Sequence, residues 1–206
     1  TGWKQVKLKE IGTFSKGAGI SKAELLPAGL NAIRYGEIYM QHHFQVKKIS
    51  SFISEDSAKL SKKIQFGDII FAGSGETIDE IGKSAAYIYD EDCYAGGDTI
   101  IFTPKGCNSL FLSFLLNIGN TRKELRELGQ GQSVVHIYKK DIEELSISLP
   151  PFPEQQKIVE VLEAWDSYLE KLTKAIRFKK SIKKGLMQYF FMGKIRLSES
   201  CKEWDY

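Results

Sequence analysis

The residues of this sequence that could hold a metal ion or carry out catalysis lack the spacing that those roles require. His42, His43 and His136 show no metal-ligand spacing with one another or with any cysteine, so no metal site is expected. The acidic residues 90–92 are consecutive, and in an extended segment their side chains alternate between faces and cannot converge on Mg²⁺. We interpret this run as a turn and expect no nuclease site.

The segment from Gly75 to Ser84 has glycines and a lysine in an order that resembles a phosphate-binding loop. A P-loop places four residues between its glycines, whereas six residues separate Gly75 from Gly82. Asp79 and Glu80 would also lie where phosphate charge must be bound. Nucleotide hydrolysis is therefore not expected. No glycine-rich loop of the cofactor-binding type follows a predicted strand, so we expect no cofactor and no methyl-donor site.

A polar, glycine-containing segment, Gly129 to Ile137, has side chains suited to reading DNA. Its polar residues and the two lysines beyond it are Gln130, Gln132, Ser133, His136, Lys139 and Lys140. Glutamine can pair bidentately with adenine, serine and histidine can donate or accept hydrogen bonds, and lysine can reach phosphates. An ordinary glycine loop explains the segment equally well, and the residues alone do not decide.

The net charge of +3 says little about a partner, but the charge is unevenly distributed. Residues 1–63 carry eleven Lys and Arg against five Asp and Glu, residues 64–153 carry seven against thirteen, and residues 154–197 carry ten against five. This distribution permits a basic face, on which the steering of nucleic acid depends. Scattered, solvated charge is the alternative.

Residues 1–149 predict a domain of the α+β class, with mixed helices and strands. The predicted strands are Ile64–Ala72, Ala85–Tyr89, Thr99–Thr103 and Ser146–Leu149, with glycine turns at 73–75 and 96–98. The predicted helices are a short one capped by Ser54 and running through Leu60, one capped by Asn108 and running to about Ile118, one with a capping box at Thr121 and Glu124 and an end at Gly129, and a last turn at Asp141–Leu145.

A long helix is predicted after a proline linker at residues 150–153, because proline lacks a backbone donor and restricts the residue before it. The helix is predicted at residues 154–192, and the stretch of about 37 residues from Glu154 to about Phe190 would be about 55 Å long. Residues 193–206 form a tail. Apolar residues recur along it with the 4-3-4-3-4 spacing of a coiled-coil seam: Ile158, Leu162, Trp165, Leu169, Leu172 and Ile176. Packing of the helix against its own domain is the alternative.

The compartment is predicted from what the sequence lacks. No apolar run approaches the roughly 18 residues that cross a bilayer, and no secretory signal is recognised at the start. The three cysteines form no CxxC pair, and such a sparse, odd set favours a reducing compartment. We therefore expect a cytoplasmic protein that does not associate with membranes.

Several segments together resemble the target-recognition domain of type I restriction-modification specificity subunits. The segments are Trp3-Lys4 with Val6-Lys7-Leu8, Gly67–Thr77 and Gly96-Gly97-Asp98. The join Pro150–Ile158 resembles the start of that family's spacer helix, and Gly185–Gln188 and Gly193–Leu197 resemble its end. The resemblance covers nearly the whole chain, and it is the ordered set of segments that is specific.

The resemblance implies a non-catalytic subunit that reads double-stranded DNA, while separate modification and restriction subunits supply methylation and cleavage. Chains of this family usually carry two recognition domains and two spacer helices, whereas this sequence has one of each and no internal repeat. We therefore expect a half subunit that reads a bipartite DNA site, either as a homodimer through the long helix or with a different half subunit.

The resemblance also implies which residues face DNA, without assigning individual base contacts. The expected DNA-binding residues are Arg34, Tyr35, Gln41, His42, His43, Ser74, Thr77, Gln130, Gln132, Ser133, His136, Lys139 and Lys140. Two alternatives from other classes remain: a coiled-coil scaffold that binds only protein, and a DNA-acting enzyme with an unrecognised site.

Overall fold

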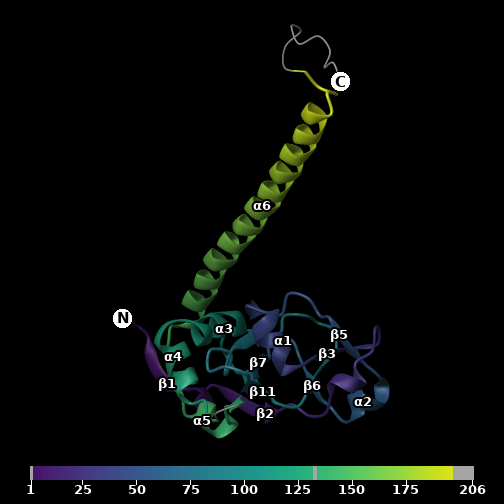
Figure 1. Ribbon diagram of the computed structural model, residues 1–206. Helices are drawn as coiled ribbons and strands as arrows, with labels where there is room; N and C mark the ends of the chain where they lie inside the picture. The colour runs from purple at the N-terminus through teal and green to yellow at the C-terminus, as the bar shows by residue number, and fades with distance from the viewer. Residues whose placement is uncertain (1, 132–133, 197–206) are drawn as a thin grey trace. The chain divides into compact units, whose positions relative to one another are not determined.

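The computed structural model describes residues 2–131 and 134–196. Two compact units divide the chain, Thr1–Val159 and Glu160–Tyr206, and Figure 1 draws both. The first unit is a mixed α/β domain, and the second contains most of one long helix. The predicted combination of an α+β domain with a long helix is confirmed.

A five-stranded sheet forms the middle layer of the domain. Its strands, in spatial order, are β2 (Gly12–Lys16), β11 (Thr99–Pro104), β7 (Ile69–Ala72), β9 (Ser84–Ala86) and β4 (Phe44–Gln45). Neighbouring strands are antiparallel, except that β4 runs parallel to β9. All residues of β7 and β9 are buried, which explains why these strands are continuous runs of apolar and small residues rather than alternating ones.

Three smaller sheets complete the strand inventory. A four-stranded sheet has the order β5 (Ser51–Ile53), β3 (Leu30–Ile33), β10 (Cys93–Ala95) and β6 (Lys62–Ile64). The two-stranded pairs are β1 (Lys4–Lys7) with β13 (Ser146–Leu149), and β8 (Ser74–Gly75) with β12 (Val135–His136). The pairing of β1 with β13 joins the two ends of the domain sequence.

Short helices surround the sheets. They are the 3₁₀ helices η1 (Leu8–Glu10) and η2 (Lys22–Glu24), and the α-helices α1 (Tyr35–Met40), α2 (Glu55–Lys59), α3 (Ser109–Asn117), α4 (Gly119–Glu127) and α5 (Lys139–Glu143). Successive residues of a strand point to opposite faces. Accordingly Ile69 and Phe71 join the core beneath α3 and α4, whereas Ile70 and Ala72 join the core shared with the four-stranded sheet.

Local signals in the sequence predicted the helix caps at Ser54 and Asn108 correctly. The Ser54 side chain accepts a hydrogen bond from the Ser57 N–H at 3.1 Å, and the Asn108 side chain accepts one from the Phe111 N–H at 3.0 Å. Each satisfies one of the backbone donors that a helix leaves unpaired at its N-terminus. The strands predicted at Thr99–Thr103 and Ser146–Leu149 are also confirmed.

The following local predictions differ from the structure. The predicted strand Ile64–Ala72 is two strands in different sheets, because the Asp68 carboxylate accepts the Gln65 N–H in a turn between them. The capping box at Thr121 is not formed, because α4 already begins at Gly119. The predicted turn at residues 73–75 is partly a strand, since β8 pairs with β12, which is distant in sequence. The strand predicted at Ala85–Tyr89 is the shorter β9, which begins one residue earlier, at Ser84, and ends three residues earlier, at Ala86.

The long helix, α6 (Phe152–Phe191), contains 40 residues, which corresponds to about 60 Å at 1.5 Å per residue. Its first two turns belong to the domain. There the Gln155 side chain donates to the Pro150 carbonyl at 2.8 Å and accepts the Asn108 N–H at 2.9 Å, and Val159 is buried in the core. Among residues 2–131 and 134–196, no helix is both long and apolar enough to cross a bilayer.

Candidate nucleic-acid interface

One end of the five-stranded sheet gathers most of the residues predicted to contact DNA. β2 and β7 end there, at Lys16 and Ala72, and β11 and β9 begin there, at Thr99 and Ser84. β4 is parallel to β9 and also begins there, directly after His43. The loops joined to these strand ends therefore lie side by side. We call this region the loop end of the sheet.

A cavity of about 320 Å³, the basic pocket, lies at the loop end beside β2 and β11. It is lined by Lys16, Gly73, Asp98, Ile100, His136, Ile137, Tyr138, Lys139 and Lys140. Three of these residues, His136, Lys139 and Lys140, were predicted from the sequence to contact DNA. Three lysines face one aspartate in this lining, so the pocket favours an anionic ligand such as a phosphate group.

Gly73 holds together the three loops that form the basic pocket. Its N–H donates to the Asp98 carbonyl at 2.8 Å, and its carbonyl accepts the Ile137 N–H at 3.0 Å. A Cβ at this position would lie 2.7 Å from the Asp98 carbonyl oxygen, so only glycine fits so close an approach. The glycine turn at residues 73–75 thus brings the segment after Gly129 against the sheet.

His136 is fixed in the basic pocket by its neighbours. Its Nδ1 is 2.8 Å from the hydroxyl oxygen of Ser74, a residue buried in β8. The backbones of His136 and Gln130 exchange two hydrogen bonds of 2.8 Å each. Among the described residues, no side chain is hydrogen-bonded to the second ring nitrogen, Nε2. His136 can therefore present Nε2 to a ligand from a fixed position.

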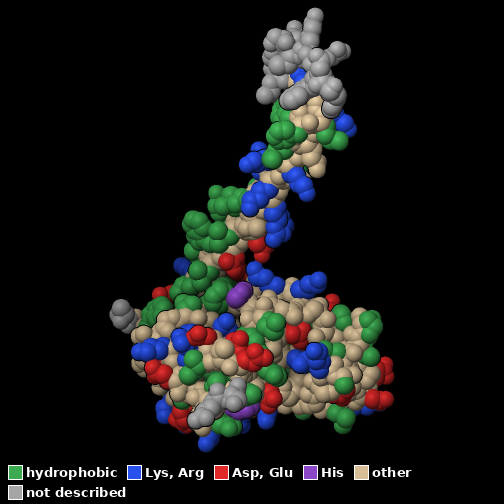
Figure 2. All heavy atoms as spheres, in the orientation of Figure 1, with side chains coloured by type: hydrophobic (Ala, Val, Ile, Leu, Met, Phe, Trp, Pro, Cys, Tyr) green, Lys and Arg blue, Asp and Glu red, His purple; other side chains and the backbone are tan. Residues whose placement is uncertain are grey.

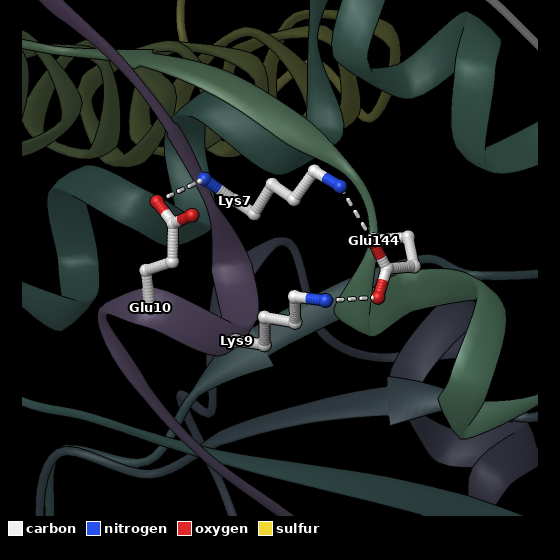
Figure 3. A network of polar contacts seen from close by, with 4 residues as sticks. All are labelled: Lys7, Lys9, Glu10 and Glu144. Atoms are coloured by element: carbon white, nitrogen blue, oxygen red, sulfur yellow. Dashed lines mark hydrogen bonds and ion pairs between the residues drawn. The ribbon is translucent and has the colours of Figure 1, made fainter.

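A polar network surrounds Glu144, the residue directly after α5 (Figure 3). The carboxylate of Glu144, directly after α5, accepts hydrogen bonds from Lys7 Nζ at 2.7 Å and from Lys9 Nζ. The Lys7 N–H donates to Glu10 at 3.0 Å. The two lysine hydrogen bonds lower the pKa of Glu144 to about 2. This network ties the C-terminal end of α5 to η1.

The two lysines of α5 differ in how much of their charge is available. Lys139 Nζ lies 3.4 Å from a carboxylate oxygen of Glu143, and the negative charge of that carboxylate partly neutralises the charge of the lysine. Lys140 Nζ lies 5.8 Å from the centre of the Tyr138 ring, within the range of a cation–π contact. In the described part of the chain, neither Lys140 nor Lys16 forms an ion pair. Lys16 and Lys140 are therefore the stronger candidates for phosphate contacts.

A second group of predicted residues surrounds α1. Arg34 precedes the helix, and its Cγ would be 3.5 Å from a Cβ added to Gly96, so it lies against the turn that leads to the basic pocket. Tyr35, half-buried, begins the helix. Gln41 is exposed, and its side chain accepts a hydrogen bond from the Ser50 hydroxyl at 2.9 Å. None of these three residues belongs to the lining of the basic pocket.

His42 and His43 have opposite environments. His42 is only 4% exposed, so its ring belongs to the interior, whereas His43 is exposed. Thr77 is exposed in the loop after β8, where its N–H donates to Glu80 at 3.0 Å. The predicted residues Gln132 and Ser133 lie outside the described residues.

Acidic residues also occupy the loop end, in the segment between β8 and β9. Glu76, Asp79 and Glu80 lie in that segment, and Asp79 pairs with Arg126 at 2.6 Å. On the face that Figure 2 shows, basic and acidic side chains are interspersed and do not form one basic stripe. Contacts with phosphate are therefore expected at localised lysines rather than along a continuous surface.

Lys16 and Tyr138 are lining residues of the basic pocket that sequence reasoning missed. Lys16 ends β2, and only the pairing of β2 with β11 brings it beside residues far along the chain. Tyr138 immediately follows the predicted loop, so its place in the sequence was the available signal. Within the described ranges, no three His, Cys, Asp or Glu side chains gather closely enough to hold a metal ion.

The predicted seam of α6 is exposed beyond the domain. Leu162, Trp165, Leu169, Leu172 and Ile176 are between 37% and 61% exposed, and Figure 2 shows hydrophobic side chains gathered along one side of the first half of the helix. Ile158 differs, because it packs against the domain core together with Val159. The exposed part of the seam therefore begins at Leu162.

Comparisons of the sequence with known proteins give a consistent result. Residues 1–180 match the family model of the type I restriction modification DNA specificity domain. The chain is 27% identical over 207 residues to the type I restriction enzyme MjaVIII specificity subunit of Methanocaldococcus jannaschii. That alignment covers 95% of this chain and 47% of the relative, so the chain spans about half the length of the curated relative it matches.

Solved structures share this fold. A structure that concerns the complex assembly and conformational transition of the type I R-M system has a TM-score of 0.63 at 20% identity, covering 91% of this chain and 44% of that chain. The S subunit from M. genitalium has a TM-score of 0.59 at 17% identity, with coverages of 92% and 46%. The HsdS subunit from Thermoanaerobacter tengcongensis has a TM-score of 0.59 at 20% identity, with coverages of 84% and 40%. The family model matches residues 1–180 of the 206 residues of this chain, so the chain belongs to the type I restriction-modification DNA specificity domain family.

Proposed function

We propose that this chain reads a short base sequence in double-stranded DNA for a type I restriction-modification complex and catalyses no reaction itself. The family match over residues 1–180 is the observation that carries the proposal. The basic pocket at the loop end supplies a matching chemistry, since it combines lysines with a fixed histidine ring. Methylation and cleavage would be supplied by partner modification and restriction subunits.

Residues of the basic pocket, together with Gln130, whose backbone is hydrogen-bonded to that of His136, would have different roles in recognition. Lys16 and Lys140 would neutralise phosphates, which position a protein on DNA but carry no sequence information. His136 and Gln130 would face base edges, because their side chains offer donors and acceptors in defined directions. The hydrogen bond between the Ser74 hydroxyl and His136 Nδ1 would keep the His136 ring in the orientation that reading a base requires.

Long-helix pairing would give this protein a second recognition domain. In this proposal residues 1–149 recognise DNA, and α6, which begins at Phe152 inside the predicted linker 150–153, supplies the spacer helix that was predicted at residues 154–192, with residues 193–206 following it. Each large side chain of the exposed seam would stabilise a pair by roughly 1.5–3 kcal/mol when buried. A second copy of the chain is the simplest partner. Two-fold symmetry then inverts the two domains, so the DNA site would be an interrupted inverted repeat.

Selection from random duplex DNA tests this function. The purified protein, alone and together with its methyltransferase partner, should enrich one sequence, and a homodimer should enrich it as an inverted repeat. A protein-only scaffold would enrich no sequence. Methylation or cleavage of DNA by the chain alone, with Mg²⁺ and a methyl donor present, would refute the non-catalytic assignment.

A further inference from the structure

A second cavity at the loop end lies beside β9 and β4, toward the opposite edge of the sheet from the basic pocket. It has a volume of about 90 Å³ and is lined by His42, His43, Phe44, Lys83, Asn117 and Arg122. We call it the second pocket. Four of its six lining residues carry a cationic or imidazole side chain, and none of the six is acidic. Its lining chemistry therefore suits an anion.

Arg122 brings a positive charge into the second pocket, and this charge forms no ion pair with any carboxylate of the described residues. Its guanidinium donates to the backbone carbonyls of Ile81 and Asp79, at 2.7 Å each. The carboxylate of Asp79 instead pairs with Arg126. Burial, and then the charge of Arg126, lower the pKa of Arg122 to about 10, so the group is still cationic at neutral pH. Those two hydrogen bonds leave three of its five N–H donors for a ligand.

Lys83 adds a second cation to the pocket. Gly82, with φ +66°, turns the chain immediately before it, and a Cβ on Gly82 would be 3.6 Å from Arg122 Nη1. This turn places Lys83 beside the arginine in the lining. Among the described residues, Lys83 forms no ion pair. Two adjacent unpaired cations repel each other, and a bound anion would remove that repulsion.

His42 is an independent observation that favours a polar ligand in the second pocket. Its ring is only 4% exposed, and in the described residues its Nδ1 has no hydrogen-bond partner. A buried polar atom without a partner is uncommon and costs free energy. Burial lowers the pKa of His42, so the ring is neutral at pH 7, and in the Nδ1–H tautomer it could donate to an oxyanion.

The backbone beside the two histidines is strained. Phe44 has φ +62°, and the Gln45 N–H donates to the His43 carbonyl at 2.6 Å across it. This is the geometry of the rare form of γ-turn, which a bulky residue adopts only where the surrounding structure enforces it. The turn is braced by the Ser113 hydroxyl, which donates to the Phe44 carbonyl at 2.5 Å. It keeps His42 and His43 in the lining of the pocket.

We propose that the second pocket binds a phosphate group, held by Lys83 and Arg122 with hydrogen bonds from the histidine rings. A volume of about 90 Å³ equals about three waters of liquid, at about 30 Å³ each, which is room for one tetrahedral oxyanion and not for a nucleotide. The phosphate group can belong to a DNA backbone or to free phosphate. The first source rests on the proposed function, since the second pocket shares the loop end with the basic pocket.

Titration with inorganic phosphate tests the site without DNA. The ring signals of His42 and His43, followed by NMR in the full chain, should shift saturably at or below about 10 mM phosphate, an affinity of a few kcal/mol. Lys83→Gln should weaken binding at least about tenfold, the usual cost of one charge-assisted hydrogen bond. Lys123→Gln is the matched control, because it removes an equal charge from α4 outside the lining and should leave binding unchanged.

Arg122→Lys is the second variant, since it keeps the charge and loses the paired donors that brace residues 79–81. It should weaken phosphate binding while the thermal unfolding transition remains cooperative. Absence of any phosphate-dependent shift in the unmodified protein would overturn the proposal. So would equal weakening by Lys83→Gln and Lys123→Gln, which would indicate diffuse charge rather than a site.

DNA binding by the same variants identifies the source of the phosphate. If the group belongs to the DNA backbone, Lys83→Gln should lower the slope of log affinity against log salt by about 0.9, and inorganic phosphate should compete with DNA. An unchanged slope, with phosphate binding weakened, assigns the pocket to free phosphate. Failure of the DNA selection together with normal phosphate binding would remove the proposed function and leave this site standing.

Discussion

Replacing Lys16 and Lys140 together with alanine should make DNA binding less dependent on salt. Both residues line the basic pocket, and within the described residues neither forms an ion pair, whereas Lys139 lies 3.4 Å from Glu143. Each lysine that neutralises a phosphate contributes about 0.9 to the slope of log affinity against log salt. We therefore expect the double variant to have a slope that is shallower by up to about 1.8.

That change in slope is large enough to measure. When the salt concentration is raised from about 50 to about 200 mM, the unmodified protein should lose about twelvefold more affinity for DNA than the double variant, because their slopes differ by about 1.8. Fluorescence anisotropy with a labelled duplex at four or more salt concentrations would measure it. The matched control is the double variant Lys59→Ala and Lys123→Ala, which removes two charges that already pair with Asp56 and Glu127.

The preference for the selected DNA sequence should survive this change, because phosphate contacts add affinity to all sequences alike. The affinity ratio between the selected duplex and an unrelated duplex measures the preference. A slope equal to that of the unmodified protein would refute the assignment of the basic pocket to DNA phosphates. An equal decrease in the control variant would show that overall charge, rather than the pocket, sets the salt dependence.

Three further predictions concern base reading, acid stability and the long helix. Gln130→Ala should reduce discrimination at one base pair by about 1–3 kcal/mol; full retention of the preference in a binding assay on mutated sites would assign base reading to other residues. Because the folded-state pKa of Glu144 is lowered from 4.5 to about 2, its contribution is present above pH 4.5 and is lost as the pH falls toward 2. Glu144→Gln should therefore be less stable than the parent in urea at pH 7, and its stability should fall less between pH 5 and pH 2; parallel pH curves would contradict this assignment. Changing Leu169 and Leu172 together to Asp should give a monomer with a folded domain in sedimentation and circular dichroism, since both are about half exposed and lie outside the domain; an unmodified protein that is monomeric at micromolar concentration would refute the homodimer.

Short-range patterns in the sequence determined several elements of this protein. Asn108 caps α3 because its side chain reaches an N–H three residues later, and both partners lie in one short segment. The long helix was predictable because residues 154–190 contain no proline and repeat their apolar residues at heptad spacing, which needs no information from the rest of the chain. The family resemblance rested on such segments too, since each is contiguous.

The candidate sites, by contrast, are made by contacts between distant segments. Lys16 and Lys140 share the basic pocket only because β2 pairs with β11 and because the Ile137 N–H bonds to the Gly73 carbonyl. Arg122 lies beside Lys83 only because its guanidinium donates hydrogen bonds to the backbone carbonyls of Asp79 and Ile81, in the segment that leads to Lys83. The burial of His42, which follows a short helix in a polar stretch, has no local signal either. Spacing along the chain fixes neighbours within a turn or a strand, whereas the pairing of strands decides which loops meet, and that pairing depends on the free energy of the whole core.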